Sequence, residues 1–161
     1  MICASAPQTA AIVPCSVTGS TVQVTVEYRG LASAPVTVPL AASSPGIFTF
    51  FGQERVGPGA LARAGTFVQL YVTGEGQTSP PGIDGKPAAI PLPQPLLPVT
   101  VTIDGKDAPV QYAGGAPGFV AGLMQVNVQV PEGVEGFNAA VVVRVGQARS
   151  QPGVNMTILG N

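Results

Sequence analysis

Eight carboxylate side chains and no histidine limit the chemistry that this chain can perform. Without histidine, a Ser-His or Cys-His nucleophilic pair is excluded. Glu75 and Asp84 lie nine residues apart in a glycine-rich loop, where two carboxylates can form an acid/base pair or a weak Ca²⁺ site. Surface acids in turns explain both residues better. We therefore predict no catalytic residue, no cofactor or metal site, and a protein that is not an enzyme.

Two cysteines, Cys3 and Cys15, are the other reactive side chains. They can form a disulfide bond and close a short loop if the compartment is oxidising. Two small buried thiols are an equally good interpretation, and a metal pair is disfavoured because the chain has no histidine. The sequence leaves the redox state of this pair open.

Aromatic rings, which polysaccharide sites on β-sandwiches usually employ, are scarce, with no Trp and three Tyr. Tyr28 lies on the apolar side of an alternating strand, which predicts a core position. Tyr71 is the best candidate for an exposed ring, although a covered position is favoured. The phenylalanines offer no better platform, because three of them gather with Ile47 at a break between units: Phe48, Phe50 and Phe51.

Charged residues make up only 9% of the chain, against about 25% in an average soluble domain. The seven basic residues are scattered, so nucleic acid is not an expected partner. A surface so poor in charge favours self-association. The sequence contains no run of 18 apolar residues, so no transmembrane helix is predicted. Residues 1–6 lack the regions of a signal peptide, so we expect a mature form or a part of a longer protein.

Alternation of apolar and polar residues is the dominant pattern. It is cleanest over residues 20–29, which also form the longest stretch without Gly or Pro, and long helices are therefore not expected. Short strands broken by turn signals are typical of a sandwich or barrel. The pattern predicts nine strands, at 8–13, 21–28, 34–40, 66–73, 98–103, 108–113, 120–130, 138–146 and 153–159.

Two connections have their own signals. Asp104-Gly105 favours a type I′ turn, which predicts that strands 98–103 and 108–113 pair as a hairpin. Residues 74–98 are irregular and rich in proline, which favours an extended strap that is solvated or lies along the surface.

The chain also contains an internal repeat. Residues 8–35, shifted forward by 117 positions without a gap, match at nine of 28 positions. Both stretches read as strand, Val-Pro corner, glycine turn and strand, which indicates two copies of one β unit. About a hundred residues precede the second copy and seven precede the first, so the first copy is expected to lack partner strands. The identities pair Gln8, Val13, Pro14, Val17, Gly19, Val24, Val26, Ser33 and Pro35 with Gln125, Val130, Pro131, Val134, Gly136, Val141, Val143, Ser150 and Pro152.

Several segments together resemble one known family: SAPVTV (33–38), PGIFT (45–49), YVTGEGQT (71–78), GIDG (82–85), LPVTVTI (97–103), YAGGAPG (112–118) and QVNVQVP (125–131). They are similar to the Solibacter-type C-terminal domain family, which is found at the ends of large secreted proteins of acidobacteria. The resemblance implies an extracellular β-sandwich of immunoglobulin-like character with no assigned activity. Relative to that family, this chain begins midway through its first unit and has Cys15 where an aromatic residue is expected.

The sequence therefore predicts an all-β protein with two immunoglobulin-like sandwich units. Residues 1–50 form the first, incomplete unit, residues 51–64 a connection, and residues 65–161 the second unit. The first unit has an apolar face that either the second unit or a strand from a neighbouring copy must cover. That face comprises Ile12, Val22, Val24, Val26, Val36, Val38 and Leu40.

The expected function follows from that face. We predict a non-enzymatic structural or adhesion module of the cell exterior, whose main partner is itself and which can assemble into filaments or tubes by strand complementation. The alternative is a module that binds cell-surface polysaccharide through the 74–98 loop.

Overall fold

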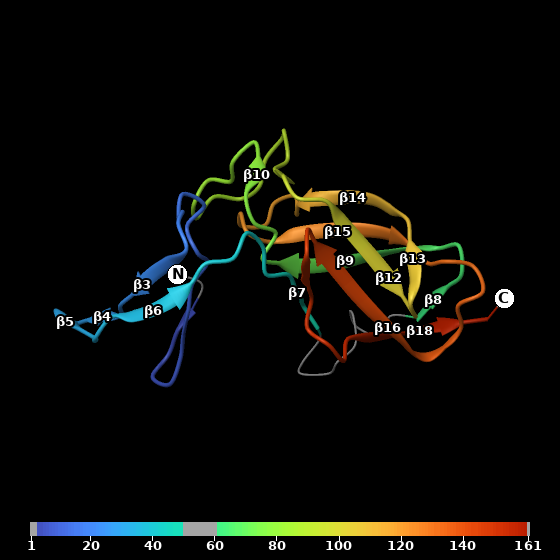
Figure 1. The fold of residues 1–161 in the computed structure, drawn as a ribbon, viewed down its shortest axis with the longest axis horizontal. Coiled ribbons are helices and arrows are strands. Elements are labelled where there is room, and N and C mark those ends of the chain that lie inside the picture. Colours follow the sequence, from blue (N-terminus) through green and yellow to red (C-terminus); the bar gives the residue numbers. More distant parts are fainter. Residues whose placement is uncertain (1–2, 50–60, 161) are drawn as a thin grey trace.

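The computed structural model describes residues 3–49 and 61–160, and these residues form strands and turns (Figure 1). The prediction of an all-β protein is confirmed. Within these ranges no helix is long and apolar enough to span a membrane. The chain has two parts, a body of two packed sheets and an arm that projects away from it on the N-terminal side.

The body contains two sheets. Among the described strands, their pairs are antiparallel except for the parallel pair of β8 with β18. The first sheet has the order β13 (Lys106–Ala108), β12 (Val99–Ile103), β16 (Gly136–Val145), β18 (Asn155–Leu159) and β8 (Leu61–Arg63), with β17 (Ala148–Arg149) also paired to β16. The second has the order β14 (Val110–Gly115), β15 (Met124–Gln129), β9 (Phe67–Thr73) and β7 (Gly46–Ile47).

The core of the body lies between these two sheets. Strand alternation places every second side chain of β16 inward, so that Val141 and Val143 are buried together with Leu70 of β9 and Val126 of β15. Because one buried cluster contains residues of both sheets, the sheets pack face to face as a β-sandwich.

The hairpin predicted at Asp104-Gly105 is present in part. Both residues have positive φ, 51° and 76°, as a type I′ turn requires, and Ile103 pairs with Lys106. The pairing ends at Ala108, so the expectation that β12 pairs through residue 113 is wrong. Pro109 lacks an N–H for the ladder, and its carbonyl already accepts the N–H of Gln129 in the other sheet.

The proline-rich strap, residues 74–98, lies along the surface as predicted. It contains one short pair of strands, β10 (Thr78–Ser79) and β11 (Gln94–Pro95), and it packs on the end of β14. Gly115 donates its N–H to the carbonyl of Pro93 (2.7 Å), and a Cβ on Gly114 would lie 2.9 Å from the same oxygen. Glycine at this end of β14 thus allows the strap to approach the backbone.

The arm consists of short antiparallel pairs (Figure 1). Near the N-terminus, β1 (Cys3–Ala4) pairs with β2 (Thr9–Ala10). Beyond it, β3 (Thr21–Val24) pairs with β6 (Val36–Pro39), and at the tip β4 (Glu27–Tyr28) pairs with β5 (Leu31–Ala32).

The sandwich includes two strands that precede residue 65. Strand β7, which falls in the predicted first unit, pairs with β9, and β8, which falls in the predicted connection, pairs with β18. Ile47 is buried in the sandwich core while Phe48 is exposed. Phe50, Phe51 and most of the predicted connection lie outside the described residues, and the division into two units stays a prediction.

Candidate functional site

The tip of the arm has the same strand register as a hairpin of the sandwich. In the arm, Glu27 pairs with Ala32 and Tyr28 with Leu31. Adding 117 to each number gives the register between β16 and β17, where Arg144 pairs with Arg149 and Val145 with Ala148. The internal repeat in the sequence therefore corresponds to a repeat in backbone structure.

One serine contact is also repeated. In the arm, the Val26 N–H donates to Ser33 Oγ (3.0 Å) and the Ser33 N–H donates to the Val26 carbonyl (2.9 Å). In the sandwich, Val143 and Ser150 make the same two bonds, at 3.1 and 2.8 Å. A shared side-chain bond with the same donor and acceptor is stronger evidence of common design than strand pairing alone.

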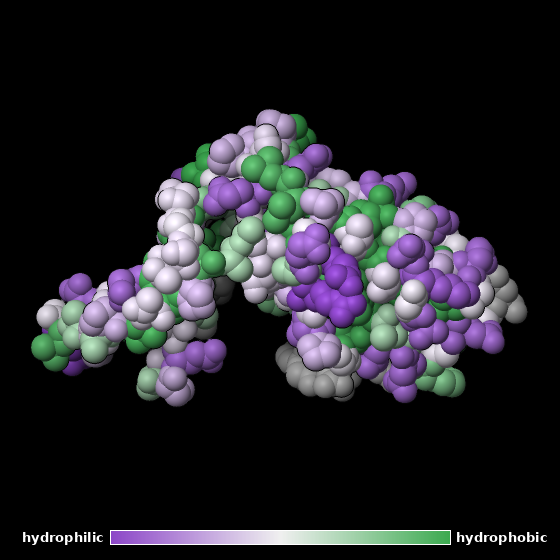
Figure 2. Space-filling model, viewed as in Figure 1, coloured by the Kyte–Doolittle hydropathy of each residue, from purple (hydrophilic) through white to green (hydrophobic). Residues whose placement is uncertain are grey.

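The two copies differ in what covers them. Val24, Val26 and Tyr28 are 46%, 50% and 69% exposed, whereas their counterparts Val141, Val143 and Val145 are at most 1% exposed. On the second strand, Val36 and Val38 are exposed, and the residues in the matching register, Val154 and Met156, are buried. Figure 2 shows hydrophobic residues at the surface of the projecting arm. The arm thus presents to solvent the face that the sandwich buries.

The sandwich shows which neighbours are missing from the arm. There, β12 pairs antiparallel with residues 141–145 of β16, and the second sheet covers the apolar face. In the part of the chain that the structure describes, no strand pairs with residues 24–28 on the equivalent edge. The arm lacks both an edge strand and an opposing layer.

The two edges of the arm differ in their backbone groups. The Leu40 N–H bonds the Ser20 carbonyl and the Ser33 N–H bonds the Val26 carbonyl, so even-numbered residues of 20–26 direct their backbone groups inward. By strand alternation, the outward groups on the β3 edge belong to odd-numbered residues, and those on the β6 edge to residues 35, 37 and 39. Residues 35 and 39 are prolines without an N–H. The other edge, which runs from Ser20 through β3 to β4 and is called the β3 edge, contains no proline. It offers N–H groups from Thr21, Gln23, Thr25 and Glu27.

The arm is attached to the sandwich where residues 41–46 cross the Gly74–Gly76 loop. The Ser44 N–H donates to the Gly74 carbonyl (2.9 Å), and Ser43 Oγ donates to the Val145 carbonyl (2.7 Å). A Cβ on Gly74 would overlap the Ser44 carbonyl, and one on Gly76 would overlap the carbonyl of Ala42. Glycine at both positions lets the two backbones pack directly on each other.

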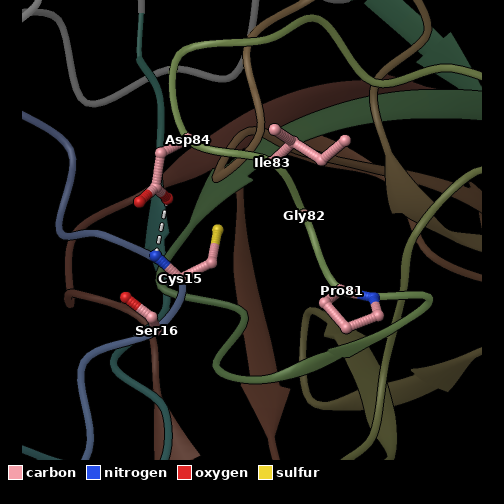
Figure 3. Close-up of a pocket in the computed structure, with 6 residues that line it drawn as sticks. All are labelled: Cys15, Ser16, Pro81, Gly82, Ile83 and Asp84. Carbon is pink, nitrogen blue, oxygen red and sulfur yellow. Dashed lines mark hydrogen bonds between the residues drawn. The ribbon is translucent and has the colours of Figure 1, made fainter.

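A second attachment joins residues 12–17 to the strap (Figure 3). The Cys15 N–H donates to Asp84 Oδ1 (2.7 Å), and Gln77 Nε2 donates to the Cys15 carbonyl (3.1 Å). Cys15, Asp84 and their neighbours line an open surface pocket. With one attachment before β3 and one after β6, both ends of the exposed hairpin are held on the sandwich.

Glu75 lies beneath the first attachment and is 5% exposed. Its Oε2 has no hydrogen-bond partner among the described residues, and burial raises its pKa to about 7. The charge of Glu75 also contributes to raised pKa values at Cys15 and Tyr112, in each case after burial as the largest cause. A buried carboxyl without a partner is neutral at mildly acid pH and costly to ionise.

The sequence-predicted residues have different outcomes. Asp84 is an exposed acid in a turn, as expected, whereas the same expectation is wrong for Glu75, because the glycines beside it allow residues 41–46 to cover it. Within residues 3–49 and 61–160, no group of three or more His, Cys, Asp and Glu side chains is placed to hold a metal ion. Cys15 forms no disulfide with a described residue. The side chain of Cys3 lies outside the described part, so the disulfide between the two stays a prediction.

The two tyrosines considered as binding or core residues differ in exposure. Tyr71 is half-buried and its ring lies 6.0 Å from that of Phe119, centroid to centroid, at 51°. Tyr28, predicted in a core, is exposed in the single chain, with the guanidinium of Arg29 5.2 Å from its ring centroid. Alternation had indicated the apolar face of Tyr28 correctly, but it carries no information about whether another layer covers that face.

No family model, curated protein or solved structure matches the chain. The resemblance to the Solibacter-type family therefore stays a prediction, and the candidate site rests on the chain's own geometry. Two signals in the sequence indicate the site: the repeat, and the prolines at 35 and 39 that leave β3 as the open edge of the arm.

Proposed function

We propose that this protein is a non-enzymatic structural or adhesion module of the cell exterior that assembles with copies of itself through the arm. One observation carries the proposal: the arm exposes an apolar face whose counterpart, 117 residues later, is the buried face of a sandwich. Large contiguous apolar patches on a protein surface usually mark an interaction site.

The energy available from covering this face is large. Fully burying seven aliphatic side chains contributes roughly 10–20 kcal/mol, at ~1.5–3 kcal/mol each. Part of this free energy is already gained, because Ile12, Val22 and Leu40 are half-buried in the single chain. The remainder is comparable with the ~4–15 kcal/mol of translational and rotational freedom lost on association, so burial of this face contributes much of what stable assembly requires.

A neighbouring copy is favoured over the chain's own sandwich as the cover. Both ends of the hairpin are attached to the sandwich, by Ser44 at one end and Cys15 at the other, while the hairpin between them points away from it (Figure 1). Folding back would require these contacts to break. The small number of charged residues also reduces the repulsion between copies.

The extracellular setting and the immunoglobulin-like character of the sandwich come from the family resemblance. Polysaccharide binding through the strap is less well supported, because Tyr71 is half-buried and tilted against Phe119, so the two rings form no flat platform. We therefore keep polysaccharide as an outcome of the test.

Sedimentation velocity over a concentration series, with negative-stain microscopy, tests the proposal. The unaltered chain is expected to form oligomers or polymers, and the double variant Val24→Glu/Val26→Glu is expected to remain a monomer because it charges the exposed face. Asn138→Glu/Gln147→Glu, which adds the same charge at two exposed positions of the sandwich, is the control and should still assemble. A monomeric unaltered chain that polysaccharide columns retain would contradict assembly and support the alternative.

A further inference from the structure

We propose that the β3 edge of one arm pairs with the β3 edge of a second copy, antiparallel and with Val24 opposite Val24 of the second copy. This inference rests on the proposed function and names the contact that produces it. The two arms then form one four-stranded sheet about a two-fold axis.

The argument begins with the edges of the arm. The outer edge of β6 has Pro35 and Pro39 at two of its three outward positions, and proline at an edge prevents further strand pairing. The outer edge of β3 has no proline, and Glu27 is its one charged residue. An extended edge without such protection is suited to accept another strand.

The sandwich indicates what kind of strand fits. The equivalent edge of β16 pairs antiparallel with β12, whose sequence Val-Thr-Val-Thr-Ile alternates small apolar and polar residues. Strand β3, with Thr-Val-Gln-Val followed by Thr25 and Val26, has the same alternation. A second copy of β3 therefore offers the chemistry that β12 supplies inside the sandwich.

The remaining edges of the sandwich fit less well. Strand β13 is short and has Lys106 and Asp107 at its exposed positions, and charged residues on a short edge strand disfavour pairing. Strand β14 is contacted by the strap at Gly115, and β8 has only three residues. Strand β3 combines an edge without proline with an exposed apolar face.

The backbone determines the register. Outward groups belong to odd-numbered residues, and in an antiparallel ladder the residues that exchange hydrogen bonds must face each other. In a two-fold pair, odd residues face odd residues when a residue lies on the axis, and face even residues when the axis passes midway between two residues. A residue therefore lies on the axis, and centring on Val24 overlaps all of residues 20–28. Thr21 then faces Glu27 of the second copy, Gln23 faces Thr25, and the overlap provides about eight backbone hydrogen bonds.

The same register places the apolar side chains well. Val22 faces Val26 of the second copy and Val24 faces its own equivalent, so all large apolar residues lie on one side of the joined sheet. No like charges face each other, since Glu27 lies opposite a threonine. Two such sheets can stack through their apolar faces, as the two sheets of the sandwich do.

Cysteine cross-linking tests the pairing in a background with Cys3→Ser and Cys15→Ser. Directly opposed residues of a non-hydrogen-bonded pair have Cβ atoms about 4.5–5.5 Å apart, within reach of a disulfide after small adjustments. Val24→Cys is expected to form covalent dimers under mild oxidation. Val22→Cys and Val26→Cys are each expected to remain uncross-linked alone and to form a mixed dimer when combined. Leu31→Cys, exposed at the tip and outside the overlap, is the control and should not cross-link.

Sedimentation of the cysteine-free background separates the two proposals. If the background assembles but the Val22 and Val26 variants fail to form the mixed dimer, the β3 pairing is wrong while assembly stands. If the background remains a monomer at every concentration, both proposals fail. Cross-linking of Leu31→Cys as efficient as that of Val24→Cys would indicate random collision and would also overturn the pairing.

Discussion

Val26 and Val143 occupy equivalent positions in two copies of one hairpin and have the same hydrogen-bonded serine neighbour, yet Val26 is half exposed and Val143 is fully buried. The strand register at the tip and the serine hydrogen bonds are the same in both places. What differs is the presence of a covering sheet, so comparison of the two copies isolates the contribution of that cover.

Truncating the two valines should have different effects on stability. Val143→Ala removes two buried methyl groups and leaves a cavity, so the free energy of unfolding should fall by about 2–3 kcal/mol. Val26→Ala should change it by less than about 0.5 kcal/mol at a concentration where the chain is monomeric. Urea denaturation of both variants checks the difference, and equal losses would show that the arm face is covered within the chain.

Removing the shared serine should also distinguish the copies. Ser150→Ala leaves the buried N–H of Val143 without its acceptor, which should cost about 1–3 kcal/mol. Ser33→Ala leaves the N–H of Val26 on an exposed strand, where water replaces the hydroxyl. The free energy of unfolding of the dilute protein should therefore fall by only about a few tenths of a kcal/mol. Thermal unfolding measures both. A large loss for Ser33→Ala in the monomer would contradict the exposed arm.

Gly74 and Gly85 form a matched pair for testing the attachment of the arm. Their φ values are nearly equal, 72° and 70°, but a Cβ on Gly74 would overlap the Ser44 carbonyl, and one on Gly85 meets nothing within 4 Å. Gly85→Ala should lower the free energy of unfolding only by the strain of a positive φ, about 1–2 kcal/mol. Gly74→Ala should cost at least about 2 kcal/mol more and should increase proteolysis within residues 41–46. Equal effects would show that the close approach is not required.

Glu75 should make stability depend on pH between about 4.5 and 7. Its pKa is 4.5 as an unperturbed carboxyl and about 7 when folded, so the folded state holds a proton that the unfolded state releases in this window. Stability is therefore expected to fall as pH rises from 4.5 to 7, and to change little from this group above 7. Glu75→Gln should remove the slope and stabilise the protein at pH 8 by about 3 kcal/mol, the free energy that corresponds to the shift in pKa.

Urea titrations at several pH values, on the unaltered chain and on Glu75→Gln, measure this slope. Asp84→Asn provides the control, since Asp84 is exposed and should leave the slope in place. A Glu75→Gln variant that keeps the slope would assign it to another group.

Much of the fold could be predicted from local patterns. Alternation located strands such as 67–73 and 99–103 to within one or two residues, and Asp104-Gly105 identified its turn, because side-chain period and φ preference are properties of short segments. The move of the chain into the other sheet after Ala108 was missed, because strand alternation does not specify the partner strand.

The candidate site was predicted in outline. The apolar face of the arm follows from alternation at Val22, Val24 and Val26, but its exposure depends on layers that are remote in sequence or belong to another molecule. The burial of Glu75 depends on backbone packing against residues 41–46. The glycines on either side of Glu75 were the available signal for this packing, since they remove the Cβ atoms that would prevent it.

Hydrogen–deuterium exchange across residues 20–28, measured at low and at high protein concentration, tests the central claim most directly. Residues 141–145, which are equivalent to residues 24–28, provide an internal reference that stays protected at both concentrations because β12 pairs with them. We predict that amides of Thr21, Gln23, Thr25 and Glu27 exchange freely in dilute protein and become protected as copies associate. Free exchange of these amides at high concentration would contradict the account.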